Sequence, residues 1–311
     1  MAYNLNDIIR QVSTDPQGFV AESGERYELN IRRAANRIAG NLNGSRIVLL
    51  SGPSGSGKTT TAHKIEARLE QMGIVTHTVS MDDYYRDVGE NSPRNERGEL
   101  DFESPECLDL ELLARHFTDL NAGREIVVPR FDFHAQARDR NAGTPLRLSA
   151  NEMVIFEGIH ALNGTLSDAA PDVPTEKVYI SARSNVVDSS GAVVFKGTWM
   201  RILRRAVRDE LFRGADAALT FSMWENLRRG EKRWISPFKN TADVIFDSSF
   251  ACEVSLLKPF AGHIFDGVKP DFDRYKEIMQ LRDALELFPT LDAKLLPENS
   301  MLREFIGDAG L

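Results

Sequence analysis

The residues best suited to chemistry lie together in one stretch, Ser51 to Thr60, which reads SGPSGSGKTT. This stretch fits G-x-x-x-x-G-K-[ST], a glycine-rich loop whose backbone N–H groups surround a polyphosphate at the start of a helix. Lys58 is placed to reach the β- and γ-phosphates, and the Thr59 hydroxyl to coordinate Mg²⁺. The motif predicts a site for ATP and Mg²⁺ formed by Gly52, Pro53, Ser54, Gly55, Ser56, Gly57, Lys58, Thr59 and Thr60.

The segments on either side supply the context that this loop needs. Residues 47–50 are an apolar, β-branched run typical of a buried strand, and residues 60–70 are rich in helix formers, with Ile65 and Leu69 four positions apart. Residues 74–80 predict a second strand. A strand–loop–helix–strand unit implies a parallel sheet with a right-handed crossover. We therefore expect an α/β fold of the P-loop NTPase type, with helices flanking a parallel sheet.

Acidic residues follow two predicted strands, at the end where open α/β sheets bind ligands. Asp82 and Asp83 come after the strand at 74–80, and Glu157 comes directly after the apolar run 153–156. One carboxylate there can hold Mg²⁺, and another can accept the proton of an attacking hydroxyl. Acids in solvated turns are common, but beside a phosphate loop the pattern favours phosphoryl transfer.

Four arginines, Arg201, Arg204, Arg205 and Arg208, share one face of a helix predicted over residues 199–214. Guanidinium groups form paired hydrogen bonds with phosphate oxygens. The helix could be a lid that closes over ATP, an ordinary exposed charged helix or a nucleic-acid patch. The net charge of −8 disfavours nucleic acid as a partner, and the phosphate loop favours the lid.

Composition and segmentation bound the remaining possibilities. The chain of 311 residues has no apolar run near the roughly 20 residues of a membrane helix, lacks a signal-peptide pattern, and has only two cysteines, Cys107 and Cys252. We expect a cytoplasmic protein with no membrane partner. We divide it into an N-terminal helical extension (1–45), with helices before and after a break around Pro16, Gly18 and Gly24, a P-loop domain (46–250) and a mainly helical C-terminal extension (251–311). Strand-like residues 125–129 and 144–148 predict a small β-hairpin lobe, and the C-terminal extension suits packing or a homo-oligomer contact.

Further segments resemble, in order, the uridine kinase and phosphoribulokinase family of small-molecule kinases, and most closely its bacterial nucleoside kinases. The resemblance covers about residues 46 to 250. Beyond it, the chain end SMLREFIG (300–307) resembles the kinase part of longer bacterial nucleoside kinases. The motifs are VSMDDYYR (79–86), DFESPECLD (101–109), PRFDFHAQAR (129–138), VIFEGIHAL (154–162), RILRRAVRDELFRG (201–214) and ADVIF (242–246).

The resemblance implies an ATP- and Mg²⁺-dependent kinase that phosphorylates the 5′-hydroxyl of uridine or cytidine. It implies that Asp82 orients or deprotonates this hydroxyl, that Thr59 and Glu157 organise Mg²⁺, and that Arg213 contacts ATP. Lys58, Arg204 and Arg208 would stabilise the transferring phosphoryl group. The implied acceptor pocket consists of Tyr85, Phe102, Glu103, Phe131, Phe133, Gln136, Arg138 and Arg201.

Three positions depart from the family pattern in the part that reads the acceptor. Glu103 stands in place of the ribose-binding aspartate, Gln136 in place of a base-contacting histidine, and Phe131 in place of a tyrosine. These changes leave open a kinase for another alcohol, such as a sugar, a sugar phosphate or a pantothenate-like acid. Two functions of a different class also stay open: a nucleotide-gated binding protein without phosphoryl transfer, and an RNA-binding protein with an arginine helix.

Overall fold

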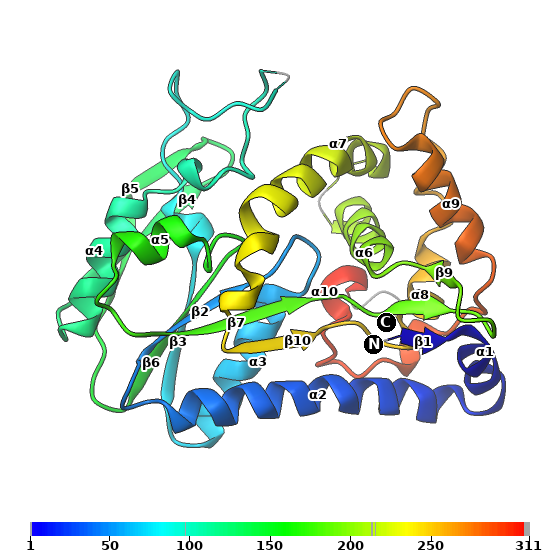
Figure 1. The fold of residues 1–311 in the computed structure, drawn as a ribbon, viewed down its shortest axis with the longest axis horizontal. Helices are drawn as coiled ribbons and strands as arrows, with labels where there is room; N and C mark the ends of the chain where they lie inside the picture. The colour runs from blue at the N-terminus through cyan, green and yellow to red at the C-terminus, as the bar shows by residue number, and fades with distance from the viewer. Residues whose placement is uncertain (1, 97, 213, 215, 308–311) are drawn as a thin grey trace.

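The protein, described by a computed structural model over residues 2–96, 98–212, 214 and 216–307, is built on a five-stranded sheet (Figure 1). The strand order is β10-β7-β2-β6-β3, and every pair is parallel. This confirms the predicted α/β fold with a parallel sheet. The strands are β2 (Ile47–Ser51), β3 (Val75–Ser80), β6 (Glu152–Glu157), β7 (Thr175–Ser181) and β10 (Val244–Asp247).

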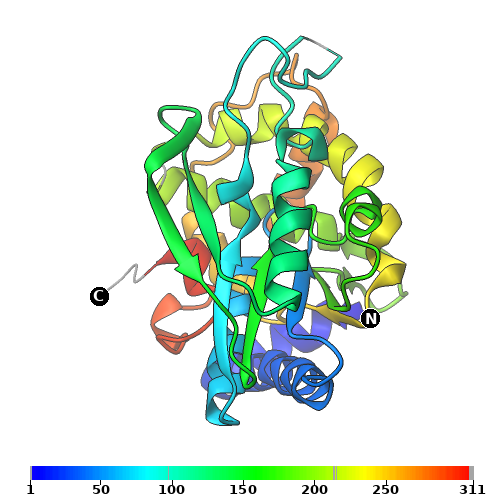
Figure 2. The same cartoon turned by 90° about the vertical axis from the view of Figure 1, so that its left-hand side faces the viewer.

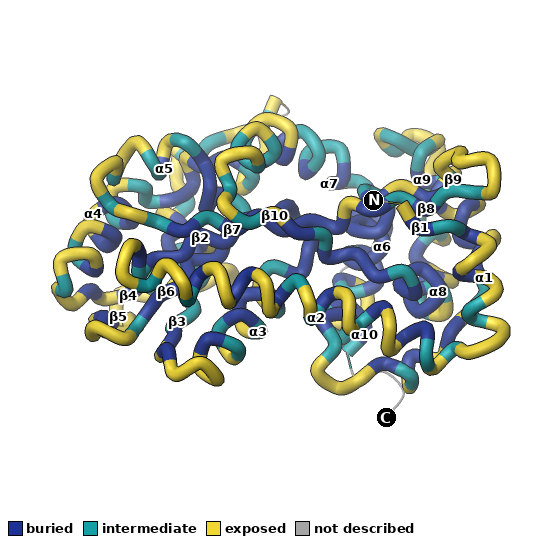
Figure 3. Tube along the Cα trace, turned by 60° about the horizontal axis from the view of Figure 1, so that its bottom comes forward, coloured by how far each residue is buried: buried dark blue, intermediate teal, exposed yellow. Residues whose placement is uncertain are grey.

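Alternate residues of β2 enter two different cores, one on each face of the sheet. Val48 and Leu50 pack with α2 (Pro16–Gly40) and α3 (Lys58–Gln71). Ile47 and Leu49 pack with α4 (Leu110–Asn121) and α5 (Gly164–Ala169) on the opposite face. Successive side chains of a strand point to opposite faces, so a strand covered on both sides reads as one continuous apolar run. Figure 3 shows β2 buried throughout, whereas α2 exposes one side.

The predicted hairpin lobe is present as β4 (Ile126–Asp132) and β5 (Ala137–Leu146), an antiparallel pair with an irregularity between Pro129 and Phe131. In Figure 2 the pair stands apart from the central sheet as a two-stranded ribbon. Both strands are longer than the sequence pattern indicated, because many residues of β5 are exposed and carry no apolar alternation.

The predicted break in the N-terminal helices is wrong in position. After β1 (Ala2–Asn4) and α1 (Leu5–Thr14), a single helix, α2, runs through Gly18 and Gly24. Pro16 stands in its first turn, where the missing N–H costs nothing, and the Asp15 side chain caps the helix by accepting from Gly18 N. β1 pairs with β8 (Asn185–Val187), which pairs with β9 (Val193–Phe195), so the chain start forms part of a second sheet.

The C-terminal extension contains less helix than predicted. Its helices are α8 (Glu253–Leu257), α9 (Tyr275–Leu285) and α10 (Arg303–Ile306), with 3-10 turns at Lys258–Phe260 and Ala293–Leu295. Buried residues from both ends of the chain, including Ile8, Ile38 and Phe305, belong to the same core as Val48 and Leu50. The terminal segments therefore pack as part of the body that carries the sheet.

Two helices, α6 (Gly197–Phe212) and α7 (Ala217–Gly230), follow the small sheet, and α7 continues into turns at Glu231–Ile235 and Ser236–Thr241. They lie over the end of the central sheet where the phosphate loop begins (Figure 1). Searched over the described ranges, the helices include none with both the length and the apolar character needed to cross a bilayer.

Candidate active site

The phosphate loop turns between β2 and α3, as predicted, and its backbone explains its glycines. Gly55 and Gly57 have φ of +75° and +81°, values that L side chains rarely adopt. A Cβ on Gly57 would also lie 2.6 Å from Met301 Sδ, and one on Gly52 would collide with the Ile180 carbonyl. The loop therefore needs glycine for both its conformation and its close packing.

Three carbonyls of the loop accept hydrogen bonds from protein donors. Ser56 O accepts from Ser248 Oγ at 2.7 Å, Gly55 O from Arg204 at 3.1 Å, and Ser54 O from Arg201 at 3.2 Å. These bonds fix the loop at the start of α3, and the N-terminus of a helix attracts an anion. This arrangement fits the triphosphate predicted from the motif.

Thr59 and Glu157, the predicted Mg²⁺ ligands, lie together. The Thr59 hydroxyl donates to Glu157 Oε1 at 3.1 Å, and Glu157 is buried at the end of β6. β6 runs between β2 and β3, with Glu157 beside Leu50 and Ser80. In the described part of the chain no three His, Cys, Asp or Glu side chains form a metal cluster. One hydroxyl and one carboxylate suit Mg²⁺, which is usually completed by phosphates and water.

The adjacent acids Asp82 and Asp83 have different environments within the 3-10 turn Met81–Tyr84. Asp83 is half-buried, and its Oδ1 accepts from Phe131 N at 3.1 Å, so it ties the turn to the hairpin. Burial raises the pKa of Asp83. Asp82 is exposed and is the second residue of this turn, which follows directly on β3. Its accessibility suits a residue that meets an acceptor hydroxyl, although its exact role stays a prediction.

The arginine helix, predicted as a lid, is anchored in the core by two of its arginines, and its closure over ATP stays a prediction. Arg204 is fully buried in a 2.5 Å ion pair with Glu253 and also donates to Gly55 O and Ser248 O. Arg201 is 2% exposed and pairs with Glu231 at 2.7 Å. Any closing movement of this helix would have to break these contacts.

Arg201 and Arg204 have extensive contacts within the protein, and their predicted roles toward the acceptor and the phosphoryl group stay predictions. The Arg201 guanidinium donates to Ser54 O and Glu231, and the Arg204 guanidinium donates to Gly55 O and Glu253, so both brace loop carbonyls and buried carboxylates. Arg208 is largely buried and bonds Asp209 Oδ1 at 2.9 Å. Arg213 lies outside the described residues.

Arg205 is a residue whose role the sequence analysis missed. Its Nη1 donates to Ser54 Oγ in the phosphate loop at 2.7 Å, and its side chain lines an open cavity. Arg205 directly follows Arg204 on the same helix. The helical pattern alone does not show that Arg204 is buried whereas Arg205 reaches the phosphate loop.

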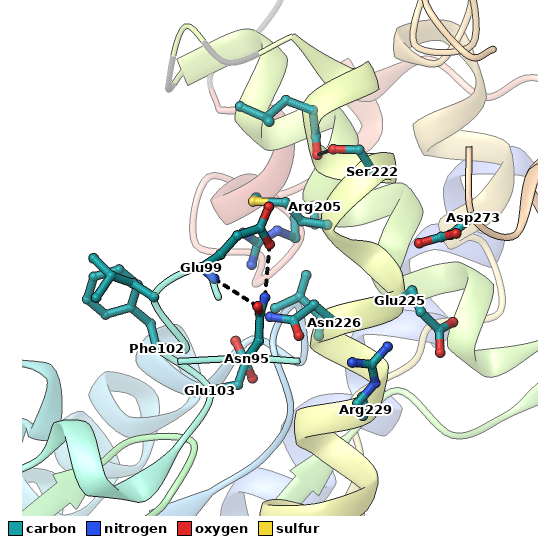
Figure 4. Close-up of a pocket in the computed structure, with 14 residues that line it drawn as sticks. Asn95, Glu99, Phe102, Glu103, Arg205, Ser222, Glu225, Asn226, Arg229 and Asp273 are labelled. Atoms are coloured by element: carbon teal, nitrogen blue, oxygen red, sulfur yellow. Dashed lines mark hydrogen bonds between the residues drawn. The ribbon is translucent and has the colours of Figure 1, made fainter. Parts of the chain in front are cut away.

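This cavity, about 640 Å³, lies between α7 and the loop that contains residues 95, 96 and 98–103 (Figure 4). Phe102, Glu103 and Arg205 line it on one side, and Asn226 and Arg229 come from α7. The loop is fixed by reciprocal bonds, Glu99 N to Asn95 Oδ1 at 3.0 Å and Asn95 Nδ2 to Glu99 Oε2 at 2.9 Å. Arg205 of α6 and the predicted acceptor residues Phe102 and Glu103 therefore line the same cavity.

Glu103 is the most perturbed acid of the site. Burial raises its pKa to about 7, the nearby charges of Asp101 and Asp82 act in the same direction, and Arg205 and Lys58 oppose them. Glu103, Asp82, Lys58 and Arg205 are therefore close enough for their charges to interact. A carboxyl group with a pKa near neutrality can exchange a proton at physiological pH.

Four aromatic side chains form a cluster beside Asp82. The Tyr85 ring centroid lies 5.9 Å from Phe102, 5.5 Å from Phe131 and 6.1 Å from Phe133, and Phe131 and Phe133 are 5.1 Å apart. Tyr85 and Phe131 are buried, whereas Phe102 and Phe133 are 36% and 58% exposed. The two exposed rings offer a flat apolar surface to a ligand.

The other two predicted acceptor contacts have different positions. Arg138 donates to the carbonyls of Tyr84 and Tyr85 and to Asp109 Oδ2, so it supports the aromatic cluster from the protein side. Its predicted role as an acceptor contact stays a prediction. Gln136 has φ +52° in the hairpin turn, its carbonyl accepts from Val88 N at 3.0 Å, and it is exposed.

His160 is a second residue to which the sequence analysis gave no role. It lies three positions after Glu157 and is 1% exposed. Burial lowers its pKa to about 3, so the imidazole is neutral, and the Glu103 backbone and Lys58 are its neighbours. Its place in VIFEGIHAL was the one available signal.

Comparisons with known proteins identify the family of the chain. The model of the "Phosphoribulokinase / Uridine kinase family" matches residues 47–255. A protein named uridine kinase from Staphylococcus epidermidis is 29% identical over 217 residues, covering 69% of this chain and 93% of the relative. A uridine kinase from Halobacterium salinarum is 27% identical over 213 residues, covering 67% and 83%.

Among solved structures, a possible uridine kinase from Bacillus stearothermophilus is 18% identical, with a TM-score of 0.45, covering 71% of this chain and 100% of that one. The matched residues 47–255 contain the phosphate loop, Asp82, Glu157 and the arginine helix. The chain is therefore an ATP-dependent phosphotransferase of α/β fold and belongs to the phosphoribulokinase and uridine kinase family.

Proposed function

We propose that the protein phosphorylates the 5′-hydroxyl of a pyrimidine nucleoside, uridine or cytidine, with ATP and Mg²⁺. The observation that carries this proposal is the aromatic cluster, with Phe102 and Phe133 partly open to solvent next to Asp82 and Glu103. A planar base stacks on exposed aromatic rings, and carboxylates accept hydrogen bonds from sugar hydroxyls. The naming of several relatives as uridine kinases supports the same acceptor.

In the proposed reaction, the loop N–H groups and Lys58 bind the triphosphate of ATP. Asp82 orients the acceptor hydroxyl and receives its proton, while Lys58 and Arg205 stabilise charge on the transferring phosphoryl group. Thr59 and Glu157 would hold Mg²⁺, which neutralises phosphate charge when bound. Glu103 and the aromatic cluster hold the acceptor, so that the hydroxyl is positioned before the γ-phosphate.

The site and the composition also bear on where the reaction takes place. Both cysteines, Cys107 and Cys252, are free and buried, which suits a reducing compartment, and we propose a cytoplasmic enzyme. The acceptor is a small molecule; neither the acidic net charge nor the site geometry supports nucleic acid as a substrate.

The test is ADP release with ATP and Mg²⁺ against uridine, cytidine, purine nucleosides, sugars, sugar phosphates and pantothenate. Stimulation by uridine or cytidine, with the product identified as the 5′-monophosphate and the signal abolished by Asp82→Asn, is the expected result. Stimulation only by a non-nucleoside would refute the nucleoside assignment and favour the second candidate, a same-fold kinase for another alcohol. Glu103 and Gln136, which depart from the family pattern, are the observation that keeps this candidate.

A further inference from the structure

The segment 300–307, which contains α10, packs directly on the phosphate loop. Figure 1 shows α10 beside α6, near the start of α3. Met301 is fully buried, with its Sδ against Gly57. The Thr60 hydroxyl donates to Glu304 Oε2 at 2.5 Å. Segment 300–307 therefore contacts Gly57, directly before Lys58, and Thr60, two residues after it.

A second contact from this segment reaches the loop through Arg204. The Arg204 guanidinium carbon lies 5.0 Å from the centroid of the buried Phe305 ring, a cation–π arrangement. The same guanidinium donates to Gly55 O at 3.1 Å. Phe305 thus supports the arginine that fixes the middle of the loop.

Helix α2 holds Thr61, the residue that follows Thr60 in α3. The Tyr27 hydroxyl forms a 2.8 Å buried hydrogen bond with Thr61 Oγ1, and Glu28 pairs with Lys64 at 2.6 Å. Thr60 is therefore held by the C-terminal segment and Thr61 by α2. Tyr27 and Glu304 both lie outside residues 47–255, the part matched by the family model.

We infer that Glu304 is a positioning residue for nucleotide binding, and that segment 300–307 is a built-in brace of the phosphate loop. This inference rests on the proposed ATP site. A glycine-rich loop has high conformational freedom, and phosphate binding needs its N–H groups held within about 0.5 Å of the productive geometry. Glu304 fixes the first turn of α3 through Thr60, and its carboxylate stands at the helix end that favours negative charge.

The test compares Glu304→Ala and Glu304→Gln in the full chain, with Glu298→Ala as the matched control, since Glu298 is an exposed acid two residues before this segment. The dissociation constant for Mg·ATP is measured by calorimetry, together with kcat and KM for ATP. Glu304→Ala is expected to weaken ATP binding about tenfold, the effect of losing one hydrogen bond to a charged group. Glu304→Gln is expected to recover most of this loss, because its amide oxygen can still accept from Thr60, and kcat at saturating ATP is expected to be unchanged.

A double-mutant cycle with Thr60→Val tests whether Glu304 acts through Thr60. The losses of ATP affinity are expected to be non-additive: the double variant should bind ATP no more weakly than whichever single variant binds it less tightly. Fully additive losses would overturn the inference. A lower melting temperature with unchanged ATP affinity would also overturn it, because Glu304 would then be a purely structural contact. Tighter ATP binding in Glu304→Ala would overturn it too, because Glu304 would then oppose ATP binding. ATP affinity is measured without an acceptor, so an incorrect nucleoside assignment leaves this test intact.

Discussion

The Thr59 hydroxyl donates a 3.1 Å hydrogen bond to Glu157 Oε1, and this contact joins the helix that follows the phosphate loop to the end of β6. The two residues are 98 positions apart in the chain. Their meeting places a hydroxyl and a carboxylate, both suitable Mg²⁺ ligands, at the mouth of the nucleotide site. If Mg²⁺ binds here as we propose, the metal and the nucleotide share neighbouring residues of the same loop and strand end.

The first prediction concerns that contact. Glu157→Gln is expected to raise the Mg²⁺ concentration needed for half-maximal activity by about tenfold or more, the range typical of altered metal-site partners. Activity titrated with Mg²⁺ at fixed ATP measures the effect. Glu152→Gln, at the opposite end of the same strand, is the control. Equal Mg²⁺ requirements in both variants would remove Glu157 from the metal site.

The second prediction separates two adjacent acids. Asp82→Asn is expected to lower kcat by about 10²–10⁴-fold, the loss typical of a positioned base, with ATP affinity nearly unchanged. Asp83→Asn is expected to change kcat and the melting temperature little, because the Asn amide oxygen can still accept from Phe131 N and keep the hairpin tied to the turn. Steady-state kinetics and thermal unfolding measure the two effects. The assignment of the base would be wrong if Asp83→Asn gave the larger loss of kcat.

The third prediction is a pH dependence set by Glu103. Burial raises its pKa to about 7 from the ordinary value of 4.5, so the native state binds this proton more tightly than the unfolded chain does. Its contribution to the free energy of unfolding is complete below pH 4.5 and is lost as the pH rises through 7.

The same ionisation is expected to change acceptor binding. Above about pH 7 the carboxylate can accept hydrogen bonds from acceptor hydroxyls, so KM for the acceptor should fall between about pH 6 and 8. KM is measured across this range in the native protein and in Glu103→Gln. A variant that keeps the native pH profile would show that another group titrates.

The fourth prediction concerns the aromatic cluster. Phe133→Ala is expected to raise KM for a nucleoside by about tenfold, since stacking of one base contributes about 1–3 kcal/mol. Its effect on stability should be small, because the ring is 58% exposed. Val127→Ala is the control, since Val127 is 57% exposed in β4, the strand that leads to Phe133. Similar KM values for both variants would exclude base stacking on Phe133.

The fifth prediction distinguishes two consecutive arginines. Arg204→Met is expected to destabilise the fold by about 3–5 kcal/mol, because Glu253 would remain buried without its partner. Arg205→Met should cost less stability and lower kcat, since Arg205 reaches Ser54 Oγ and the cavity. Denaturant unfolding and kinetics are measured for both. Full kcat in Arg205→Met would contradict its proposed role.

The sequence alone was sufficient to predict the parallel central sheet and the glycine-rich loop between β2 and α3, and the reason is physical. A phosphate loop needs glycine at positions such as Gly55 and Gly57, where φ is positive, and needs Lys58 and Thr59 directly after it. Strands buried on both faces read as apolar runs such as residues 47–50. These are local constraints, so they are visible in a linear pattern. The order of motifs likewise indicated the family.

Tertiary structure decided what the charged residues do. A helical pattern places Arg201, Arg204 and Arg205 on one face, but only the packing of Glu231 and Glu253 shows that two of them are buried braces while Arg205 lines the cavity. In the same way, Arg138 proved to support the aromatic cluster. Partners distant in sequence determine whether a charge is satisfied by the protein or left for a ligand.

The chain ends show the same division. Pro16 and Gly18 predicted an interruption between two helices. Instead, α2 begins at Pro16 and continues through Gly18, because Asp15 caps it and tertiary contacts bury one of its faces. The residues SMLREFIG resembled a family motif without an assigned role, and folding places them against Gly57 and Thr60. Nothing local in that segment predicts a partner 244 residues away; only the folded core brings Glu304 and Thr60 together.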